Sequence, residues 1–413
     1  MARIALLLLA FTTNVTAQSP AAQRPARADD LTVFVQTVGP GDMVWEYYGH
    51  NSIVVLDEKS GQGVSFNYGI FLEPSASVFL SGKLLYRVAP MDAALELQEF
   101  RSFGRRVWRQ KLQLTAQQKQ QLIAFLEWNV APENRHYDYH YYLDNCSTRV
   151  RDALDRALGG QLRTQLVRPI DETFRWHASR LSRPVWSLWA GIQMAQGLTT
   201  DAPITIWEET FLPGILQREL RQVSVAMSDG SHAPLVISEE EFAPLTGTTE
   251  LVEPAEPPSW LWWHLLVGLL VGGTITELAR AQRRKLLLIA TAFWCALSGA
   301  VGGLLVYLWW GSAHAYSANN MNLLYYSPLD LVLLPLLALS IVTGKCGRAA
   351  FVVAYAIVAM ALIGLLLELI PALSQTNGSL VALAVPIHGA VALVARDFWR
   401  GAAEPAPAPE AAS

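Results

Sequence analysis

Two different patterns of hydrophobic and polar positions divide the chain. Between residues 29 and 249, short apolar runs alternate with polar turns, which predicts an α+β domain of ordinary polarity. Beyond residue 258, five apolar stretches follow one another, and each approaches the ~20 residues that a membrane-spanning helix needs. These stretches are 259–279, 286–310, 327–343, 349–371 and 379–395. The segment 250–258 between the two patterns is rich in proline and glutamate and predicts a linker.

The first pattern predicts a sheet that contains one clear hairpin. Apolar residues dominate 51–56 and 63–68, and the polar stretch between them contains the turn sequence Glu-Lys-Ser-Gly. Further strands are predicted over 31–37 and 83–88. Helices are predicted over 115–128, where Thr115 and Gln118 form a capping box, and over 146–160.

Charges between the apolar stretches indicate how the chain crosses the membrane. The basic positions lie within 280–285, 345–348 and 396–400. The loops 311–326 and 372–378 contain neither lysine nor arginine. Because basic loops stay in the cytoplasm, the α+β domain and both neutral loops are predicted to lie outside it. Residues 1–18, with Arg3 ahead of a short apolar run, predict a secretory signal peptide, which agrees with this orientation.

The composition supports a membrane protein and argues against one class of partner. Of the 413 residues, 52% are hydrophobic and 16% are charged, which is too apolar for an ordinary soluble protein. The formal net charge is −4 and the chain has no long basic run, so a nucleic-acid partner is not expected. Residues 401–413, rich in alanine and proline, are predicted to form a disordered tail.

Cys146 is the one cysteine outside the hydrophobic C-terminal part of the chain, and its surroundings predict reactivity. It follows Asp144 and Asn145, either of which is a suitable N-cap, and it precedes a helical pattern over 149–158. A helix N-terminus offers free N–H groups and partial positive charge, and both favour a thiolate. The alternative is a buried and inert thiol.

His50 is the predicted base for this thiol. It opens a predicted strand, and a strand histidine that faces a cysteine at a helix start is the arrangement of papain-like thiol enzymes. Asn67 lies on the neighbouring strand of the hairpin and is the predicted group that orients the imidazole. Asn145 or the backbone N–H of Cys146 is predicted to stabilise an oxyanion. The predicted catalytic residues are therefore Cys146, His50, Asn67 and Asn145.

Further histidines and one asparagine lie at positions that could bind a metal or have a separate role. His136 and His140 lie near Cys146, but a His-x-x-x-His pair converges on zinc when it lies on a helix, and 137–142 has an extended or irregular pattern. Neither a metal nor another cofactor is predicted. His314 and Asn320 lie in a neutral loop of the membrane part, where they are either functional or solvated.

The order of these motifs resembles that of a known group of enzymes. A histidine strand that precedes an Asn-Cys helix is the reversed order of the circularly permuted papain-like enzymes, namely the permuted NlpC/P60 group and the lecithin–retinol acyltransferase-like proteins. More closely, the chain resembles the Lnb N-terminal periplasmic domain family of bacterial membrane proteins. The matching segments are 39–42, 48–51, 66–69, 139–152, 201–203, 211–213, His314 and 320–324. One departure is Thr37-Val38, where a small residue or a cysteine is expected before the Gly-Pro-Gly-Asp turn.

This resemblance implies a permuted papain-like exported domain followed by a bundle of about five transmembrane helices in the bacterial inner membrane. The implied function is a membrane-tethered periplasmic cysteine hydrolase or acyltransferase. It would act on amide or ester bonds of envelope lipids or peptides through a thioester on Cys146. The alternative is a non-catalytic, chaperone-like, assembly or sensor protein that uses the same groove for binding. The resemblance does not imply a particular substrate.

Overall fold

The computed structural model describes residues 30–71, 75–246 and 254–403. The predicted signal peptide, residues 250–253 of the predicted linker and the tail beyond residue 403 lie outside the described residues. The chain forms two compact units. Unit 1 comprises the residues up to Glu172 together with Pro203–Glu253, and unit 2 comprises Thr173–Ala202 together with Pro254–Ser413.

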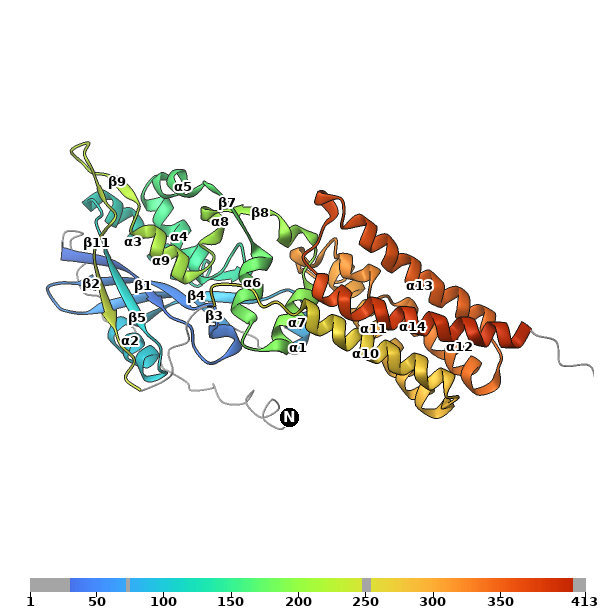
Figure 1. The fold of residues 1–413 in the computed structure, drawn as a ribbon. Helices are drawn as coiled ribbons and strands as arrows, with labels where there is room; N and C mark the ends of the chain where they lie inside the picture. Colours follow the sequence, from blue (N-terminus) through green and yellow to red (C-terminus); the bar gives the residue numbers. More distant parts are fainter. Residues whose placement is uncertain (1–29, 72–74, 247–253, 404–413) are drawn as a thin grey trace, which may run out of the picture. The chain divides into compact units, whose positions relative to one another are not determined.

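Unit 1 is organised around an antiparallel sheet of seven strands in the order β11-β5-β1-β2-β3-β4-β6 (Figure 1). Its strands are β1 (Leu31–Val38), β2 (His50–Asp57), β3 (Gly63–Phe71), β4 (Leu85–Asp92), β5 (Val107–Leu112), β6 (His136–Asp138) and β11 (Val236–Phe242). The strands predicted over 31–37, 51–56, 63–68 and 83–88 are thereby confirmed as β1 to β4, with β4 ending later than expected.

The predicted hairpin joins β2 and β3, in the register that pairs Ser52 with Asn67. Its turn is closed by the Asp57 carboxylate, which accepts hydrogen bonds from the backbone N–H of Lys59 and from the Ser60 hydroxyl, both at 2.9 Å. Because side chains alternate along a strand, His50 and Ser52 share one face of β2, and Asn51 takes the other. The hairpin thus sets the side on which each polar residue of β2 lies.

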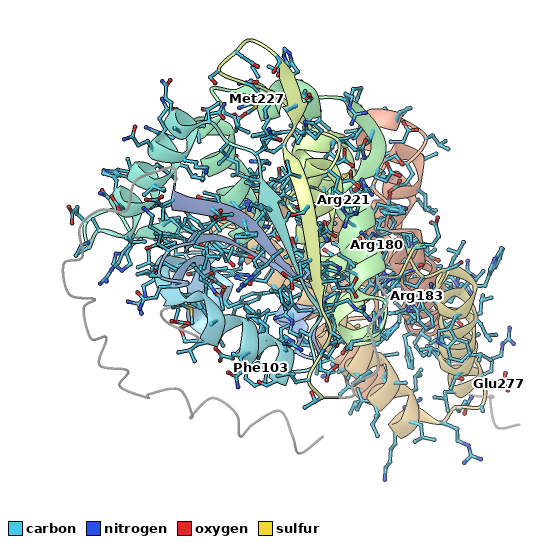
Figure 2. All side chains as sticks on the ribbon, turned by 90° about the vertical axis from the view of Figure 1, so that its left-hand side faces the viewer. Phe103, Arg180, Arg183, Arg221, Met227 and Glu277 are labelled. Atoms are coloured by element: carbon cyan, nitrogen blue, oxygen red, sulfur yellow. The ribbon has the colours of Figure 1, made fainter. Side chains whose placement is uncertain are left out.

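Helices cover both faces of this sheet, and shorter elements complete the unit. The helices are α1 (Ala76–Ser81), α2 (Ala93–Ser102), α3 (Ala116–Val130), α4 (Cys146–Ala157), α5 (Gln161–Leu166), α8 (Ile206–Glu209) and α9 (Pro213–Leu220), with a 3-10 turn η2 (Val44–Glu46). Two small antiparallel sheets pair β7 (Pro169–Thr173) with β8 (Pro203–Thr205) and β9 (Ser224–Ala226) with β10 (His232–Pro234). Met227 lies in the turn that joins β9 to β10 (Figure 2). The predicted helix over 115–128 and its capping box are confirmed in α3.

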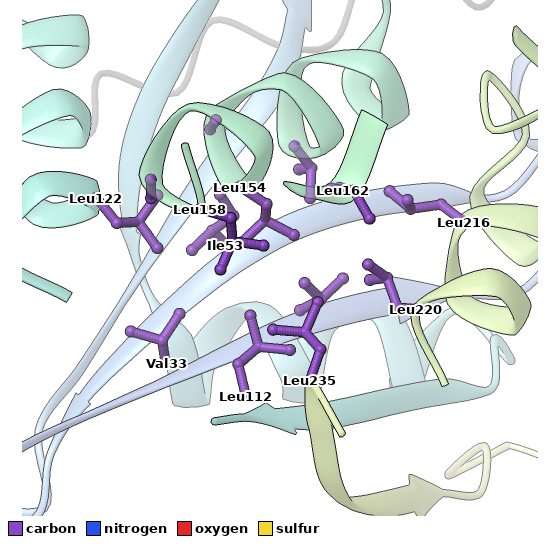
Figure 3. Close-up of a cluster of buried hydrophobic side chains, with 14 of the residues drawn as sticks. Val33, Ile53, Leu112, Leu122, Leu154, Leu158, Leu162, Leu216, Leu220 and Leu235 are labelled. Carbon is purple, nitrogen blue, oxygen red and sulfur yellow. The ribbon is translucent and has the colours of Figure 1, made fainter. Parts of the chain in front are cut away.

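The hydrophobic core of unit 1 lies between the sheet and the helices α3, α4, α5 and α9. Leu154 and Leu158 of α4 pack in one cluster with Ile53 of β2, beside Leu216 of α9 (Figure 3). All four are fully buried, and complete burial of a leucine side chain stabilises a fold by about 1.5–3 kcal/mol. The core therefore anchors α4, and with it the position of Cys146 at the first turn of that helix.

Unit 2 contains five helices that are long and apolar enough to cross a membrane. They are α10 (Leu261–Arg280), α11 (Arg284–Trp310), α12 (Leu329–Thr343), α13 (Gly347–Leu367) and α14 (Gly378–Ala403), with the 3-10 turns η4 (Ala315–Ser317), η5 (Met321–Leu324) and η6 (Pro371–Leu373) in the connections. The apolar stretches predicted from the sequence are confirmed as these helices. Successive helices pack against each other, and α10 also packs against α14.

The contact between α10 and α14 depends on two glycines spaced four residues apart. A Cβ atom on Gly268 would lie 2.7 Å from the carbonyl oxygen of Leu383, and one on Gly272 would lie 2.8 Å from that of Pro386. Both distances are shorter than a side chain tolerates, so glycine allows the two backbones to approach closely. Small residues with this spacing are typical of helix interfaces within membranes.

One segment within the predicted exported domain 29–249 packs with the membrane helices. Thr173–Ala202 forms part of unit 2, and the predicted bounds of the exported domain stay a prediction. This segment contains α6 (Phe174–Ser182), α7 (Trp186–Ala195) and η3 (Leu198–Asp201). Its backbone N–H groups at Gly197 and Leu198 donate to the carbonyls of Tyr316 and Asn319. The segment is thus hydrogen-bonded to the connection between α11 and α12.

Candidate functional site

Cys146 occupies the first turn of α4, as predicted. Asn145 is the N-cap, and its Oδ1 atom accepts hydrogen bonds from the backbone N–H groups of Ser147 and Thr148, both at 2.9 Å. Thr148 completes the cap, because its hydroxyl accepts a hydrogen bond from the backbone of Asn145 at 2.8 Å. This arrangement satisfies N–H groups that would otherwise have no partner at a helix start.

The side chain of Asn145 is fully used by this cap and by two loops. Its Nδ2 group donates to the carbonyl of Tyr141 at 3.0 Å and to the carbonyl of Phe211 at 2.9 Å. An amide has two N–H hydrogens, and both are therefore engaged. The structure gives Asn145 a structural position, and the oxyanion role of Asn145 or of the Cys146 backbone N–H stays a prediction.

His50 and Asn67 are brought together by the β2–β3 hairpin. The Nε2 atom of His50 lies 3.0 Å from the Oδ1 atom of Asn67. The ring of His50 also packs against Phe100 of α2, with 6.0 Å between the ring centroids. Asn67 therefore contacts the imidazole in the position that an orienting group requires.

Glu96 of α2 extends this contact into a chain of three residues, which we call the His50 relay: His50, Asn67 and Glu96. Asn67 Nδ2 donates to Glu96 Oε1 at 2.6 Å, and Gln36 Nε2 donates to Glu96 Oε2 at 2.8 Å. Burial raises the pKa of Glu96, and the hydrogen bonds from Ser65, Asn67 and Gln36 act against this rise. The Glu96 carboxylate accepts from both amides, so the N–H side of the Asn67 amide faces Glu96. Its oxygen then faces His50, which fixes the hydrogen of the imidazole on Nε2 and leaves Nδ1 as the basic atom.

Gly69 lies between His50 and Cys146. A Cβ atom on Gly69 would lie 3.4 Å from His50 Cε1, 4.0 Å from His50 Nδ1 and 3.9 Å from Cys146 Cβ. The residue has a φ of +123° and sits at an irregularity in the β3–β4 pairing, where the register shifts between Tyr68 and Ile70. Glycine at this irregularity lets the His50 ring and the Cβ atom of Cys146 both lie within 4.0 Å of the same position.

Arg105 is a buried cation beside both residues, and the sequence did not single it out. Its guanidinium donates from Nε and from one NH2 group to the carbonyl of Gly39, at 2.9 and 2.8 Å. It also lies 3.6 Å from the carboxylate of Glu46 and packs over the ring of Phe100. The Gly-Pro-Gly-Asp turn that starts at Gly39 therefore holds a positive charge near the site.

Burial opposes the charged forms of both the thiol and the imidazole. It lowers the pKa of His50 to about 4, and the nearby charge of Arg105 acts in the same direction. Burial also raises the pKa of the Cys146 thiol, although N–H groups of Asn51 and Ser147 and the Arg105 charge favour the thiolate. Burial therefore opposes the thiolate that the sequence predicts, and the thiolate on Cys146 stays a prediction.

Aromatic side chains surround the thiol on the side of β4 and β6. Tyr86 stacks on Tyr139 with 4.2 Å between the ring centroids and on Phe71 with 4.8 Å. Tyr86 and Tyr139 pack, together with Cys146, against the core of unit 1. These rings make the surroundings of Cys146 apolar. Apolar surroundings disfavour a negative charge on the thiol.

His140, one of the two histidines near Cys146, contacts the backbone. His140 Nδ1 accepts hydrogen bonds from the backbone N–H groups of Tyr142 and Leu143, both at 3.2 Å, and so organises the turn before α4. Arg149 forms an ion pair with Asp144 and packs over the ring of Tyr137. Within the described ranges, no group of three or more His, Cys, Asp or Glu side chains is arranged to hold a metal ion.

The loop that carries His314 and Asn320 belongs to unit 2 and contacts α7 there. Asn320 Nδ2 donates to the carbonyl of Met194 at 2.8 Å, and Asn322 Nδ2 donates to the carbonyl of Gln193 at 3.1 Å. Both asparagine side chains are buried. These two amides therefore have a structural role in holding α7, and Asn320 is not solvated.

Comparison with protein families agrees with this two-part organisation. The model of the Lnb N-terminal periplasmic domain matches residues 18–180, and the model of the Lnb transmembrane domain matches residues 256–395. The chain belongs to the Lnb family. It is a membrane protein with a periplasmic N-terminal domain, and the predicted family resemblance is confirmed. Comparisons of this Lnb family member with curated proteins and with solved structures gave no match. The likeness to papain-like enzymes stays a prediction.

Proposed function

We propose that this Lnb family protein is a membrane-tethered cysteine hydrolase or acyltransferase that forms a thioester on Cys146. The observation that supports it most is the His50 relay, which leaves Nδ1 of a neutral imidazole as the basic atom on the side of Gly69 and Cys146. A neutral histidine can remove the thiol proton as the reaction proceeds, so a preformed thiolate is not required.

The first half of the reaction transfers an acyl group to the thiol. His50 Nδ1 accepts the proton of Cys146 while Sγ attacks the carbonyl carbon of an ester or amide. The tetrahedral intermediate then collapses, the bond to the leaving oxygen or nitrogen breaks, and His50 returns its proton to that atom. The Arg105 charge and the N–H groups near Sγ, those of Asn51 and Ser147, favour the negative charge that develops in this step.

The second half regenerates the thiol. Water or an acceptor amine or alcohol gives a proton to His50 as its oxygen or nitrogen attacks the thioester carbonyl. The carbon–sulfur bond breaks, and the sulfur takes the proton back from His50. Hydrolysis and transfer differ only in the acceptor, and the buried, aromatic surroundings of Cys146 favour transfer because they limit the access of water.

The substrate class follows from the tether and from the chemistry of the site. A periplasmic unit joined to membrane helices acts on molecules close to the membrane surface, which include envelope lipids and envelope peptides. Both contain the ester or amide bonds that a cysteine nucleophile attacks. The order of the histidine strand β2 and the cysteine helix α4 supports a permuted papain-like enzyme as the ancestor of this arrangement.

A trapping experiment tests the proposed thioester. The full-length protein with Cys295→Ala and Cys346→Ala retains Cys146 as its one thiol. After incubation with phospholipid vesicles or with an envelope peptide fraction, intact-protein mass spectrometry should show an acyl adduct that hydroxylamine removes. The adduct should map to Cys146 and should be absent from Cys146→Ser. No adduct under either condition, with Cys146 accessible to small alkylating reagents, would refute the enzyme.

A non-catalytic binding module is the second candidate, and one observation favours it. Burial raises the pKa of Cys146, which makes the resting thiol a weak nucleophile. If the groove serves binding, Cys146→Ser should support growth like the wild-type chain in a deletion strain. Loss of function with normal protein level and normal insertion would argue for the enzyme.

We also propose that the membrane is the bacterial inner membrane, with the C-terminus in the cytoplasm. The proposal is supported by the basic loops around 280–285 and 345–348 and by the neutral loop 311–326. Reporter fusions after Arg284, Ser317 and Lys345 should give cytoplasmic, periplasmic and cytoplasmic signals in that order. A cytoplasmic signal at Ser317 would contradict this topology.

A further inference from the structure

The membrane-spanning helices of unit 2 bury an aspartate and a histidine next to each other. Asp330 lies in the first turn of α12 and is 0% exposed, and His388 of α14 is 3% exposed. Asp330 Oδ1 lies 3.8 Å from His388 Nδ1. Ionisable groups within membrane spans are rare because a buried charge is costly, and those that occur are commonly functional. The pair lies outside the His50 relay, so it does not depend on the proposed function.

Two hydrogen bonds define the protonation state of His388. Its Nε2 atom lies 2.8 Å from the carbonyl oxygen of Tyr325, so Nε2 carries a hydrogen. Its Nδ1 atom accepts a hydrogen bond from Trp294 Nε1 at 3.4 Å, so Nδ1 presents a lone pair. An imidazole with one donor nitrogen and one acceptor nitrogen is neutral.

Asp330 therefore faces a lone pair and not a cation. Its Oδ2 atom accepts a hydrogen bond from Ser298 Oγ at 2.7 Å, whereas its Oδ1 atom has no hydrogen-bond partner among the described residues. A negative Oδ1 in this buried position would be opposed both by desolvation and by the Nδ1 lone pair. A hydrogen on Oδ1 would remove the negative charge and with it both costs. We propose that Asp330 and His388 form a proton-binding site within the membrane, with the proton on Asp330 Oδ1.

The other titratable groups near the pair suggest how the proton exchanges. Cys295 of α11 lies close enough to interact electrostatically with Asp330. Tyr325 contacts both the pair and Glu368. Its backbone carbonyl accepts the hydrogen bond from His388 Nε2, and its side chain interacts electrostatically with Glu368 at the end of α13. The Tyr325 hydroxyl and Glu368 Oε1 are both buried without a hydrogen-bond partner among the described residues. Successive polar groups without hydrogen-bond partners are suited to the passage of water and protons. The proton on Asp330 therefore exchanges with solvent from the Glu368 end.

Infrared difference spectroscopy on the full-length protein in lipid nanodiscs tests this proposal. At neutral pH the wild-type protein should show the carbonyl band of a protonated, buried carboxylic acid, and Asp330→Asn should lose it. Glu277→Gln is the matched control, because Glu277 lies on α10 and is exposed (Figure 2), so its removal should leave the band unchanged. A band that persists in Asp330→Asn would overturn the proposal.

Two further variants keep the test decisive if Asp330→Asn is produced poorly. Ser298→Ala retains the carboxyl group but removes the donor to Oδ2, so the band should shift without disappearing. An unshifted band would contradict its assignment to Asp330. Tyr325→Phe should slow the replacement of the acid proton by deuterium, and an unchanged exchange rate would refute the route past Tyr325 and Glu368.

Discussion

Both units of this Lnb family protein bury connected polar side chains, but the two sets end differently. The His50 relay ends at an imidazole that lies beside Gly69, as does the Cβ atom of Cys146. The second set, which we call the Arg175 network, consists of Arg175, Asp201, Asn320, Asn322 and Gln375 in unit 2. Arg175 Nε donates to both oxygens of the Asp201 carboxylate. Its NH2 group donates to the backbone carbonyls of Gln196 and Gly197 at 3.0 and 2.9 Å.

The difference separates a chemical role from a structural one. In the Arg175 network, the donors of Arg175, Asn320 and Asn322 reach backbone carbonyls of the segment 193–197, so their effect is to hold α7 and the turn after it. In the His50 relay, the hydrogen bonds orient one side chain after another and leave a basic nitrogen free. Both sets are buried and polar. They differ in the last group of each set, which is a backbone carbonyl in the Arg175 network and an imidazole in the His50 relay.

The largest effect on stability is expected from breaking the Arg175 network. Arg175 is 1% exposed, so Arg175→Met removes the buried cation that pairs with the Asp201 carboxylate and one donor from each of the Gln196 and Gly197 carbonyls. Loss of one partner of a buried ion pair typically costs about 3–5 kcal/mol. Thermal unfolding of the purified full-length protein should show this loss as a large fall in melting temperature.

Arg221→Met is the matched control for that change. Arg221 forms an ion pair with Glu239 at the surface (Figure 2), with its side chain 47% exposed. Exposed pairs of this kind contribute about 0–1 kcal/mol. Equal losses from Arg175→Met and Arg221→Met would contradict a structural role for the Arg175 network.

A large effect on activity with little effect on folding is expected from the relay. Glu96→Gln can present an N–H group to Asn67, which allows the Asn67 amide to rotate and misorients His50. We expect the rate of thioester formation to fall by roughly 10²-fold, the lower end of what a positioned base contributes. Glu99→Gln, on an exposed position of the same helix α2, should leave the rate unchanged. Equal rates for both variants would remove Glu96 from the relay.

The charge of Arg105 should set the pH range of the reaction. His50 has its pKa lowered to about 4, so the acidic limb of the kcat/KM profile should lie near pH 4. Arg105→Gln removes a positive charge that disfavours protonation of His50, so this limb should move to higher pH. The same change removes a charge that favours the thiolate of Cys146. A limb that stays in place would mean that Arg105 acts through folding only.

The smallest predicted effect is on the pH dependence of stability. The folded chain holds His50 neutral down to about pH 4, whereas an unfolded histidine binds a proton near its ordinary pKa of 6.5. Between these values the unfolded state binds more protons, so stability should rise with pH, and this contribution is lost as pH falls through 4. His50→Asn should flatten the slope of melting temperature against pH in this window, and an unchanged slope would place the dependence elsewhere.

The secondary structure was largely predictable because its signals are local. The alternation over 51–56 and 63–68, the Thr115 capping box and the five apolar stretches each depend on neighbouring residues, and each is confirmed. The meeting of His50 with Asn67 followed from the same hairpin, since antiparallel pairing aligns residues on adjacent strands.

The remaining parts of the site depend on contacts that neighbouring residues do not encode. Glu96 lies in a polar helix and becomes a relay member only because α2 packs on the hairpin. Arg105 gains its role from a turn far away in the sequence, at Gly39. Segment 173–202 has the polarity of an exported domain, yet its backbone bonds to the loop before α12, which no periodicity indicates.

The most direct test of the account is the reaction of Cys146 with a small activated ester, because this probe needs no natural substrate. In the Cys295→Ala, Cys346→Ala background, the acyl adduct on Cys146 should form in a single burst, quantified by mass spectrometry over a pH series. His50→Ala should slow this acylation by roughly 10²- to 10⁴-fold while the protein stays folded. Equal acylation rates with and without His50 would contradict the claim that the imidazole activates the thiol.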